Sequence, residues 1–242
     1  MFLALQICSA VIFCSFVQLS STNREHVYRR FIGAIIATVL INFLYFFLYP
    51  NLNFGLSFYE SLCLSILPKN ILFPFLLTVL PYSSDILFSL IYKKPIFSIS
   101  PTPILLRNIL FAPVVEELSF RFPLLLISQS FSTFPHLFYA SLPFAFAHIH
   151  HSFPVLFKFR KQLTFSLFIR IISGSLFQII YTFIFGFYAG ILVLKFGIIG
   201  TILAHSVANY FQIPIATTLS WPFKLLFVSS LFMWLYFVIS FI

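Results

Sequence analysis

The chain has 242 residues, of which 61% are hydrophobic and only 8% are charged, and its mean hydropathy is +1.06. Because about a quarter of the residues in a soluble domain are charged, this composition excludes a water-soluble globular protein and indicates an all-α polytopic membrane protein. The formal net charge is +9, but the Lys and Arg residues lie mostly between apolar runs, so we interpret them as topology signals rather than as a nucleic-acid-binding surface.

About eight apolar segments are predicted to form membrane-spanning helices, some of them broken by proline, within a single membrane-embedded domain that covers residues 1–242. In chain order they are 3–20, 31–49, 70–92, 104–128, 134–149, 166–194, 198–214 and 222–242. The first lacks a basic region and a cleavage site, so we expect a retained span rather than a signal peptide. In the sixth, Gly186 and Gly190 have the GxxxG spacing that lets two helices approach closely.

The basic residues between these segments predict an orientation. Nine of them fall on one predicted side of the membrane: Arg24, Arg29, Arg30, Lys93, Lys94, Lys158, Arg160, Lys161 and Lys224. Lys69 and Lys195 fall on the other side. The positive-inside rule therefore places the nine in the cytosol and both termini on the opposite side. The basic loops would also suit anionic lipid or the carboxylate of a substrate.

The fourth segment carries three ionisable residues, Glu116, Glu117 and Arg121, within six positions. A charge at membrane depth costs about 2.5–3.5 kcal/mol or more, so such residues usually face a bundle interior or a water-filled cavity. Glu117 and Arg121 are four residues apart and are predicted to share a helical face and to pair, whereas Glu116 is rotated by about 100°. One carboxylate is then left for chemistry, unless all three form a buried ion cluster.

Two further polar clusters lie in apolar segments. The fifth segment ends in His148, His150 and His151, with His148 the deepest of the three. His205 and Asn209 are four residues apart, so they share a helical face, and together they could hold an oxyanion. For both clusters, ordinary packing and interhelical hydrogen bonds are the competing interpretation.

If these side chains converge, they form a hydrated cavity for peptide hydrolysis. A carboxylate beside an imidazole would activate a water, and the His–Asn pair would stabilise the tetrahedral intermediate. Two alternatives remain open. Glu116, His148 and His205 could hold a catalytic zinc ion, although no HExxH spacing is present. Buried Glu, Arg and His residues, together with Asp85, would also suit a transporter or a proton relay.

In this order the three clusters resemble the EExxxR, FxxxH and HxxxN motifs of the CAAX-processing intramembrane endopeptidases, the Ras-converting enzyme (CAAX prenyl protease 2) family of the CPBP glutamic intramembrane proteases. The matching stretches are Glu116 to Arg121, Phe144 to His148 and His205 to Asn209. The stretch FAFAHIHH is similar to FGxAHxHH of the eukaryotic branch, with Ala145 where Gly is usual, and residues 178–188 resemble its QxxYTxxFGxY stretch. The resemblance covers roughly residues 105–213, which we expect to be the catalytic core.

This resemblance implies an enzyme of the endoplasmic reticulum membrane whose active site is accessible from the cytosol. Its substrates would be prenylated CaaX proteins, such as Ras-type small GTPases, from which it would remove the C-terminal aaX tripeptide. The family chemistry implies a metal-independent reaction of the glutamic type that needs no cofactor.

The resemblance also assigns roles to residues. Those that it implies to act on water and substrate are Glu116, His148, His205 and Asn209. Among them, Glu116 would activate the water with help from His148, and the other two would form the oxyanion site. Glu117 and Arg121 would be supporting residues, with Arg121 orienting a carboxylate.

Overall fold

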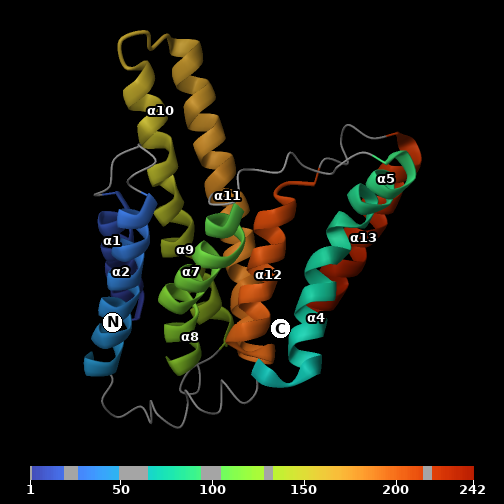
Figure 1. Cartoon of the computed structure of the whole chain (residues 1–242), viewed down its shortest axis with the longest axis horizontal. Coiled ribbons are helices and arrows are strands. Elements are labelled where there is room, and N and C mark those ends of the chain that lie inside the picture. The colour runs from blue at the N-terminus through green and yellow to red at the C-terminus, as the bar shows by residue number, and fades with distance from the viewer. Residues whose placement is uncertain (1, 19–26, 49–64, 94–104, 128–132, 215–219) are drawn as a thin grey trace. The chain divides into compact units, whose positions relative to one another are not determined.

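The computed structural model describes residues 2–18, 27–48, 65–93, 105–127, 133–214 and 220–242. Within these ranges every regular element is helical, which confirms the prediction of an all-α protein. The elements, shown in Figure 1, are α1 (Phe2–Gln18), α2 (Val27–Leu48), α4 (Pro68–Val79), η2 (Leu80–Tyr82), α5 (Ser83–Tyr92), η3 (Arg107–Phe111), α7 (Ala112–Phe120), α8 (Phe122–Ile127), α9 (Thr133–Ala147), η5 (His148–His151), α10 (Ser152–Phe159), α11 (Phe165–Phe196), α12 (Ile198–Phe211) and α13 (Trp221–Ser240).

The chain divides into two compact units. Unit 1 comprises Met1–Phe54 and Leu118–Gly190, and unit 2 comprises Gly55–Glu117 and Ile191–Ile242. The boundaries fall inside α7 and α11, so each of these helices contributes to both units. Glu116 and Glu117 thereby fall in unit 2, whereas Arg121 falls in unit 1.

In unit 1, α1 packs against α2 and α9. Hydrogen bonds of polar side chains tie α2 to the C-terminal end of α7. The hydroxyl oxygens of Thr38 and Ser119 lie 2.9 Å apart, and Nδ2 of Asn42 donates to the main-chain oxygen of Leu118 at 3.0 Å. Polar side chains of this kind join helices in an apolar environment, where no water competes for them.

The two glycines of the GxxxG pair let α9 approach α11 closely. A Cβ atom on Gly190 would lie 2.6 Å from Cδ2 of Leu137, and one on Gly186 would lie 3.1 Å from Cδ1 of Phe144. A larger residue at Gly190 would require the Leu137 side chain to shift. The sequence prediction of a close helix contact at this pair is therefore confirmed, and α9 is the helix that it contacts.

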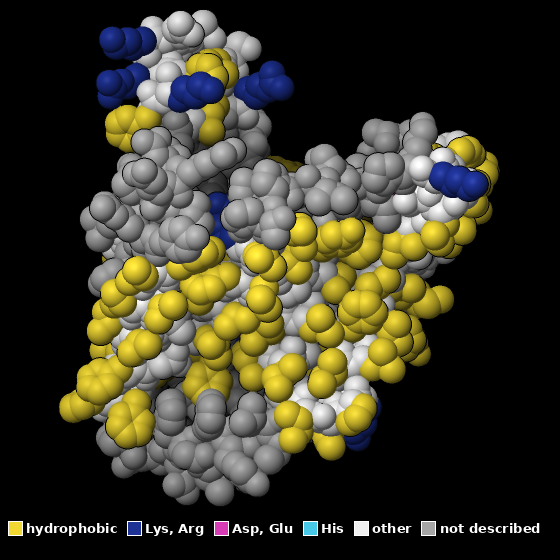
Figure 2. All heavy atoms as spheres, viewed as in Figure 1, with side chains coloured by type: hydrophobic (Ala, Val, Ile, Leu, Met, Phe, Trp, Pro, Cys, Tyr) yellow, Lys and Arg dark blue, Asp and Glu magenta, His cyan; other side chains and the backbone are white. Residues whose placement is uncertain are grey.

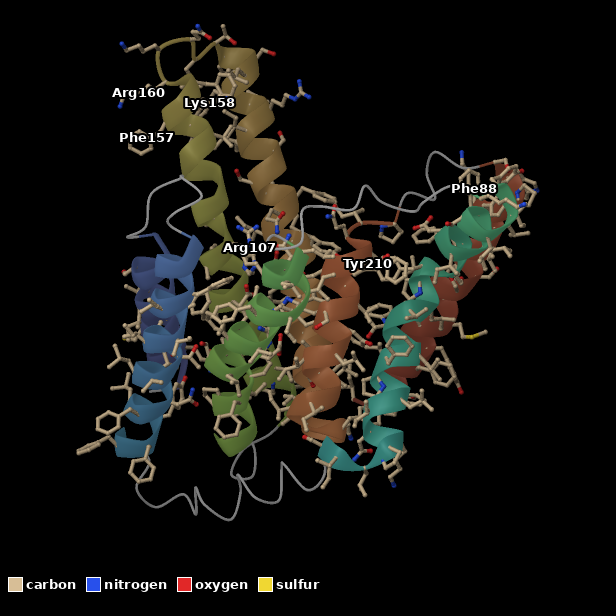
Figure 3. All side chains as sticks on the ribbon, in the orientation of Figure 1. Phe88, Arg107, Phe157, Lys158, Arg160 and Tyr210 are labelled. Atoms are coloured by element: carbon tan, nitrogen blue, oxygen red, sulfur yellow. The ribbon has the colours of Figure 1, made fainter. Side chains whose placement is uncertain are left out.

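The α-helix of the fifth predicted segment, α9, ends at Ala147, close to the predicted end at residue 149, but two further helical elements that were not predicted follow it. These are the 3-10 helix η5 and the helix α10, which ends at Phe159 and whose last turn carries Lys158, a cation that suits the negative end of the helix dipole. Lys158, Arg160 and Lys161 are exposed near the α10–α11 connection, which Figures 2 and 3 show as a cluster of cations at one tip. With 32 residues, α11 is about 48 Å long, so it exceeds the hydrocarbon core of about 30 Å.

In unit 2, α4 packs closely against α12. A Cβ atom on Gly200 would overlap the backbone oxygen of Asn70, so only glycine allows this approach. Gly197 separates α11 from α12 with a φ of 83°, a left-handed conformation that costs glycine little. The end of α11 is thereby capped, and α12 can turn back along α4.

The C-terminal end of α12 is held by an aromatic residue from the proline-containing break between α4 and α5. The ring of Tyr82 stacks on Phe211 with 4.7 Å between centroids, and its hydroxyl donates to the main-chain oxygen of Gln212 at 2.9 Å. Gln212 itself has a φ of 57°. These contacts position the last turn of α12 relative to η2.

The apolar surface agrees with a membrane protein. Within the described ranges, three helical stretches are long and apolar enough to cross a membrane, namely Pro68–Tyr92, Phe165–Phe196 and Trp221–Ser240. Many large apolar side chains are exposed on them, including Phe165 and Phe232, and Figure 2 shows such side chains over much of the visible face. Each of the eight predicted segments contains a helix, but the number of membrane spans stays a prediction.

Candidate functional site

The two glutamates lie on α7, which has Pro113 in its first turn. Proline suits this position because its missing N–H would have no helical partner there. The preceding element, η3, is a π-helix, a rare geometry that often occurs at functional sites. Glu117 is fully buried, whereas the side chain of Glu116 is 17% exposed. Of the two carboxylates, therefore, Glu116 is the one that a small molecule can reach.

His205, on α12, lies between the two carboxylates in unit 2. Its Nδ1 atom is 2.6 Å from Oε1 of Glu117, the distance of a short charge-assisted hydrogen bond. Its Nε2 atom is 3.8 Å from Oε2 of Glu116. Because an ionised carboxylate only accepts hydrogen bonds, Nδ1 carries the proton in the bond to Glu117. This bond fixes the orientation of the ring and directs Nε2 toward Glu116.

Asn209 contacts the π-helix one turn further along α12. Its Nδ2 atom donates to the main-chain oxygen of Asn108 at 3.0 Å, so one of its two amide hydrogens is engaged. The side-chain oxygen of Asn108 in turn accepts a hydrogen bond from Nε of Arg107 at 2.9 Å. The continuous stretch of η3 and α7 therefore meets α12 at two places, the His205 contacts and the Asn209 contact.

Two predicted site residues belong to unit 1, where both contact Phe144. The guanidinium carbon of Arg121 lies 3.5 Å from the centroid of the Phe144 ring, a cation–π contact, and Arg121 is only 3% exposed. Nδ1 of His148 donates to the main-chain oxygen of Phe144 at 2.8 Å. Because the carbonyl can only accept, Nδ1 of His148 carries the proton in this bond.

The predicted site residues that meet in unit 2 are Glu116, Glu117 and His205. Arg121 and His148 lie in the other unit, so the predicted pairing of Arg121 with Glu117 and the convergence of His148 on the same cavity stay predictions. The side chains of His150 and His151 lie outside the described residues. Asn209 lies one helical turn from His205, as its spacing predicts.

Two residues of this site were not identified from the sequence. Asn108 binds Asn209 through its backbone oxygen, which no side-chain pattern reveals. Arg107 had a signal, because it is a half-buried cation inside an apolar segment, nine positions before Glu116. Residues of that kind usually mark a functional site in a membrane protein.

Among the described residues, no group of three or more His, Cys, Asp and Glu side chains is placed to hold a metal ion. The three zinc ligands suggested by the sequence are Glu116, His148 and His205. Because His148 belongs to unit 1 and the other two belong to unit 2, this zinc site stays a hypothesis.

Residues 98–211 match a family model described as type II CAAX prenyl endopeptidase Rce1-like. The matched range contains every predicted site residue as well as η3, α7 and α12. Residues 98–211, called the Rce1-like segment, are therefore similar to this family.

Two curated relatives support the assignment of the Rce1-like segment. The chain is 36% identical to human CAAX prenyl protease 2 over 111 residues, which are 45% of this chain and 32% of the human protein. It is 29% identical to CAAX prenyl protease 2 of Arabidopsis thaliana over 229 residues, which are 81% of this chain and 71% of that protein. The alignment with the human relative thus spans about a third of that protein's length. No solved structure matches the chain.

Proposed function

We propose that this protein is an intramembrane endopeptidase that removes the C-terminal aaX tripeptide from prenylated CaaX proteins. The names of the Rce1-like family and of the two relatives support the reaction class. The apolar helices support a substrate whose lipid tail enters from the bilayer. We place the protein in the endoplasmic reticulum membrane with its site open to the cytosol, and Ras-type small GTPases are among the substrates.

The observation that carries this proposal is the pair formed by Glu116 and His205. Their nearest atoms are 3.8 Å apart, which is beyond the range of a direct hydrogen bond, so one water can contact both groups. The opposite nitrogen of the imidazole is held by Glu117 at 2.6 Å. A carboxylate and an oriented imidazole that share one small molecule are the components of general acid–base hydrolysis.

The reaction needs no group beyond these side chains. Glu116 takes a proton from the water, and the resulting hydroxide attacks the carbonyl carbon between the prenylated Cys and the first residue of aaX. In its doubly protonated form His205 donates from Nε2 to the oxyanion, and Asn209 donates its second amide hydrogen. The intermediate collapses as Glu116 returns the proton to the leaving nitrogen, which releases the tripeptide and a new Cys carboxylate. His148 assists the proton transfers.

Two donors aimed at an oxyanion can contribute substantially to the rate. Removing one oxyanion donor typically lowers kcat by about 10²–10³-fold, and general acid–base catalysis typically contributes about 10²–10⁴-fold. Because Glu117 is fully buried and bound to the imidazole, we assign it to positioning His205. In this assignment Glu117 does not touch the reacting atoms.

The decisive experiment is release of the tripeptide from a farnesylated CaaX peptide by the purified protein in detergent. We expect cleavage by the wild type, no cleavage of the unprenylated peptide, and loss of activity in Glu116→Ala. Glu60→Ala, a change at a glutamate outside the Rce1-like segment, is the matched control and should stay active. An arm with EDTA separates glutamate chemistry from the zinc alternative. Wild-type protein that releases no tripeptide would contradict the proposal.

A further inference from the structure

We propose that the connection between α10 and α11 binds the headgroup of an anionic phospholipid in the leaflet beside it. Four exposed cations, called the basic tip, carry this binding: Lys158, Arg160, Lys161 and Arg170. Residues 118–242 contain no Asp or Glu, so no carboxylate of α10 or α11 neutralises the tip. Its positive field therefore attracts an anion. The inference concerns lipid binding alone and does not depend on the proposed function.

The length of α11 places the basic tip at the membrane surface. Residues 171–194 of this helix carry no charged side chain and span about 36 Å, which covers a hydrocarbon core of about 30 Å. Arg170 comes directly before this run, and α11 begins about 8 Å further out at Phe165. Because the headgroup layer adds about 5–8 Å on each side of the hydrocarbon, the tip lies at the depth of the lipid headgroups.

The sign of the charge identifies the kind of lipid. By the positive-inside rule, the leaflet beside Lys158, Arg160 and Lys161 is the cytosolic one. Anionic phospholipids give that leaflet a negative surface potential, and clusters of four or more Lys and Arg residues next to a membrane-spanning helix are typical of proteins that bind such lipids. A zwitterionic lipid offers no net charge to the tip, so we expect a preference for anionic headgroups.

A hollow at the tip provides a place for a headgroup. Its volume is about 420 Å³, within the usual range of sites for small molecules. The lining residues are Phe157, Lys158, Phe159, Arg160, Lys161 and Gln162; Figure 3 labels three of them at the end of α10. Half of these side chains are cations and one is an amide, so the walls offer N–H donors for charge-assisted hydrogen bonds to phosphate oxygens.

Hydrogen bonds within the connection fix the backbone that carries the cations. The backbone nitrogen of Gln162 donates to the oxygen of Phe159 at 2.9 Å, which closes the end of α10. Oγ1 of Thr164 accepts from the backbone nitrogen of Leu167 at 3.2 Å, so this threonine caps the first turn of α11. A connection that is ordered in advance loses less conformational entropy when a ligand binds.

Exposed aromatic rings among the cations favour a lipid over a soluble anion. Phe157 is 67% exposed and Phe165 is 80% exposed. Cζ of Arg160 lies 5.9 Å from the centroid of the Phe157 ring. Nζ of Lys158 lies 5.4 Å from that of Phe159. Cations and rings therefore share one surface, and segments that lie in the membrane interface combine both, with charges at the headgroups and rings toward the acyl chains.

The test measures lipid binding to the purified full-length protein in neutral detergent by isothermal titration calorimetry. The probes are dioctanoyl phosphatidylserine, dioctanoyl phosphatidylcholine and inorganic phosphate. We expect phosphatidylserine to bind at least about 10-fold more tightly than the other two, and added salt to weaken its binding. Changing Lys158, Arg160 and Lys161 together to Gln should weaken phosphatidylserine binding by roughly 100-fold, since each cation near a membrane surface contributes about 5-fold.

Control variants separate charge from structure. Arg160→Gln alone should weaken phosphatidylserine binding by about 5-fold. Lys195→Gln removes an exposed cation from the last turn of α11, at the opposite end of the same helix, and should keep the wild-type affinity. The double change Lys158→Arg and Lys161→Arg keeps both charges and should also keep the affinity. Thermal unfolding in detergent shows whether each variant is folded.

Several results would overturn the inference. Equal affinity of the wild type for both lipids, or undiminished phosphatidylserine binding in the folded triple variant, would show that the tip is not a site for anionic lipid. Inorganic phosphate that binds as tightly as phosphatidylserine would indicate a general anion site instead. A farnesylated CaaX peptide whose acid binds more tightly than its amide, with that difference lost in the triple variant, would assign the tip to the substrate. The tripeptide-release assay tests the proposed function separately.

Discussion

His205 is bound through Nδ1 to Oε1 of Glu117 at 2.6 Å, and this contact joins α12 to α7 within unit 2. Glu117 is fully buried, and His205 is only 4% exposed. A buried carboxylate that accepts the proton of one imidazole nitrogen determines where the other nitrogen points. The contact therefore explains why two adjacent glutamates have different tasks, since one holds the imidazole and the other faces its opposite edge at 3.8 Å.

Replacing Glu117 with Gln should impair catalysis without abolishing substrate binding. The amide keeps the shape of the side chain but can present an N–H instead of an acceptor to Nδ1, which disfavours the required orientation of His205. We expect kcat to fall by roughly 10²–10⁴-fold. The lower bound is the usual effect of losing an oxyanion donor, and the upper bound is the effect of losing a carboxylate that orients a catalytic histidine. Steady-state kinetics with the farnesylated peptide measure kcat of the Glu117→Gln variant. A wild-type kcat would show that Glu117 does not position His205 for catalysis. Glu60→Gln is the control.

Replacing His148 with Ala should lower kcat by roughly 10²–10⁴-fold, the usual contribution of a general acid–base group. His136 of α9, also half-buried and in the same unit, offers a matched control, because His136→Ala removes an imidazole that has no role in the proposed mechanism. The same peptide assay applies to both. Equal activity of the two variants would mean that His148 only binds the Phe144 backbone.

Removing metal should not change the activity, because the proposed reaction uses only carboxylate, imidazole and amide groups. We expect protein treated with EDTA or phenanthroline to cleave the farnesylated peptide at the untreated rate, and elemental analysis to find substoichiometric zinc. Activity that disappears on chelation and returns with added zinc would instead support the zinc alternative, in which Glu116 and the two histidines are ligands.

Replacing Gly200 with Ala should destabilise unit 2. The added Cβ would overlap the backbone oxygen of Asn70, so α4 and α12 would have to separate, and overpacking of this kind typically costs about 1–3 kcal/mol. A Cβ atom on Gly174 of α11 would meet no described atom within 4 Å, so Gly174→Ala should be neutral or stabilise by up to about 1 kcal/mol through helix propensity. Thermal unfolding in detergent compares the two, and equal midpoints would contradict the close α4–α12 contact.

The helical architecture follows largely from composition. Segments of apolar residues between basic loops have few alternatives to helix in a membrane, because every backbone group must find its partner within the segment. Helices accordingly occur in all eight predicted segments. The continuation of the fifth segment through α10 was missed, since its last turns carry cations that resemble a loop signal. The π-helix at Arg107 was also missed, because hydrophobic periodicity does not distinguish it from an ordinary helical turn.

For the site, the sequence alone determined the class of protein, the identity of the polar groups, and the residues that share a helical face. His205 and Asn209 share a face because a spacing of four corresponds to about one helical turn. Only the tertiary structure decided that His205 binds Glu117 and that Asn209 binds the backbone of Asn108. The physical reason is that spacing fixes an angle around one helix axis, whereas a hydrogen bond between helices depends on the distance and rotation of two axes, which packing sets.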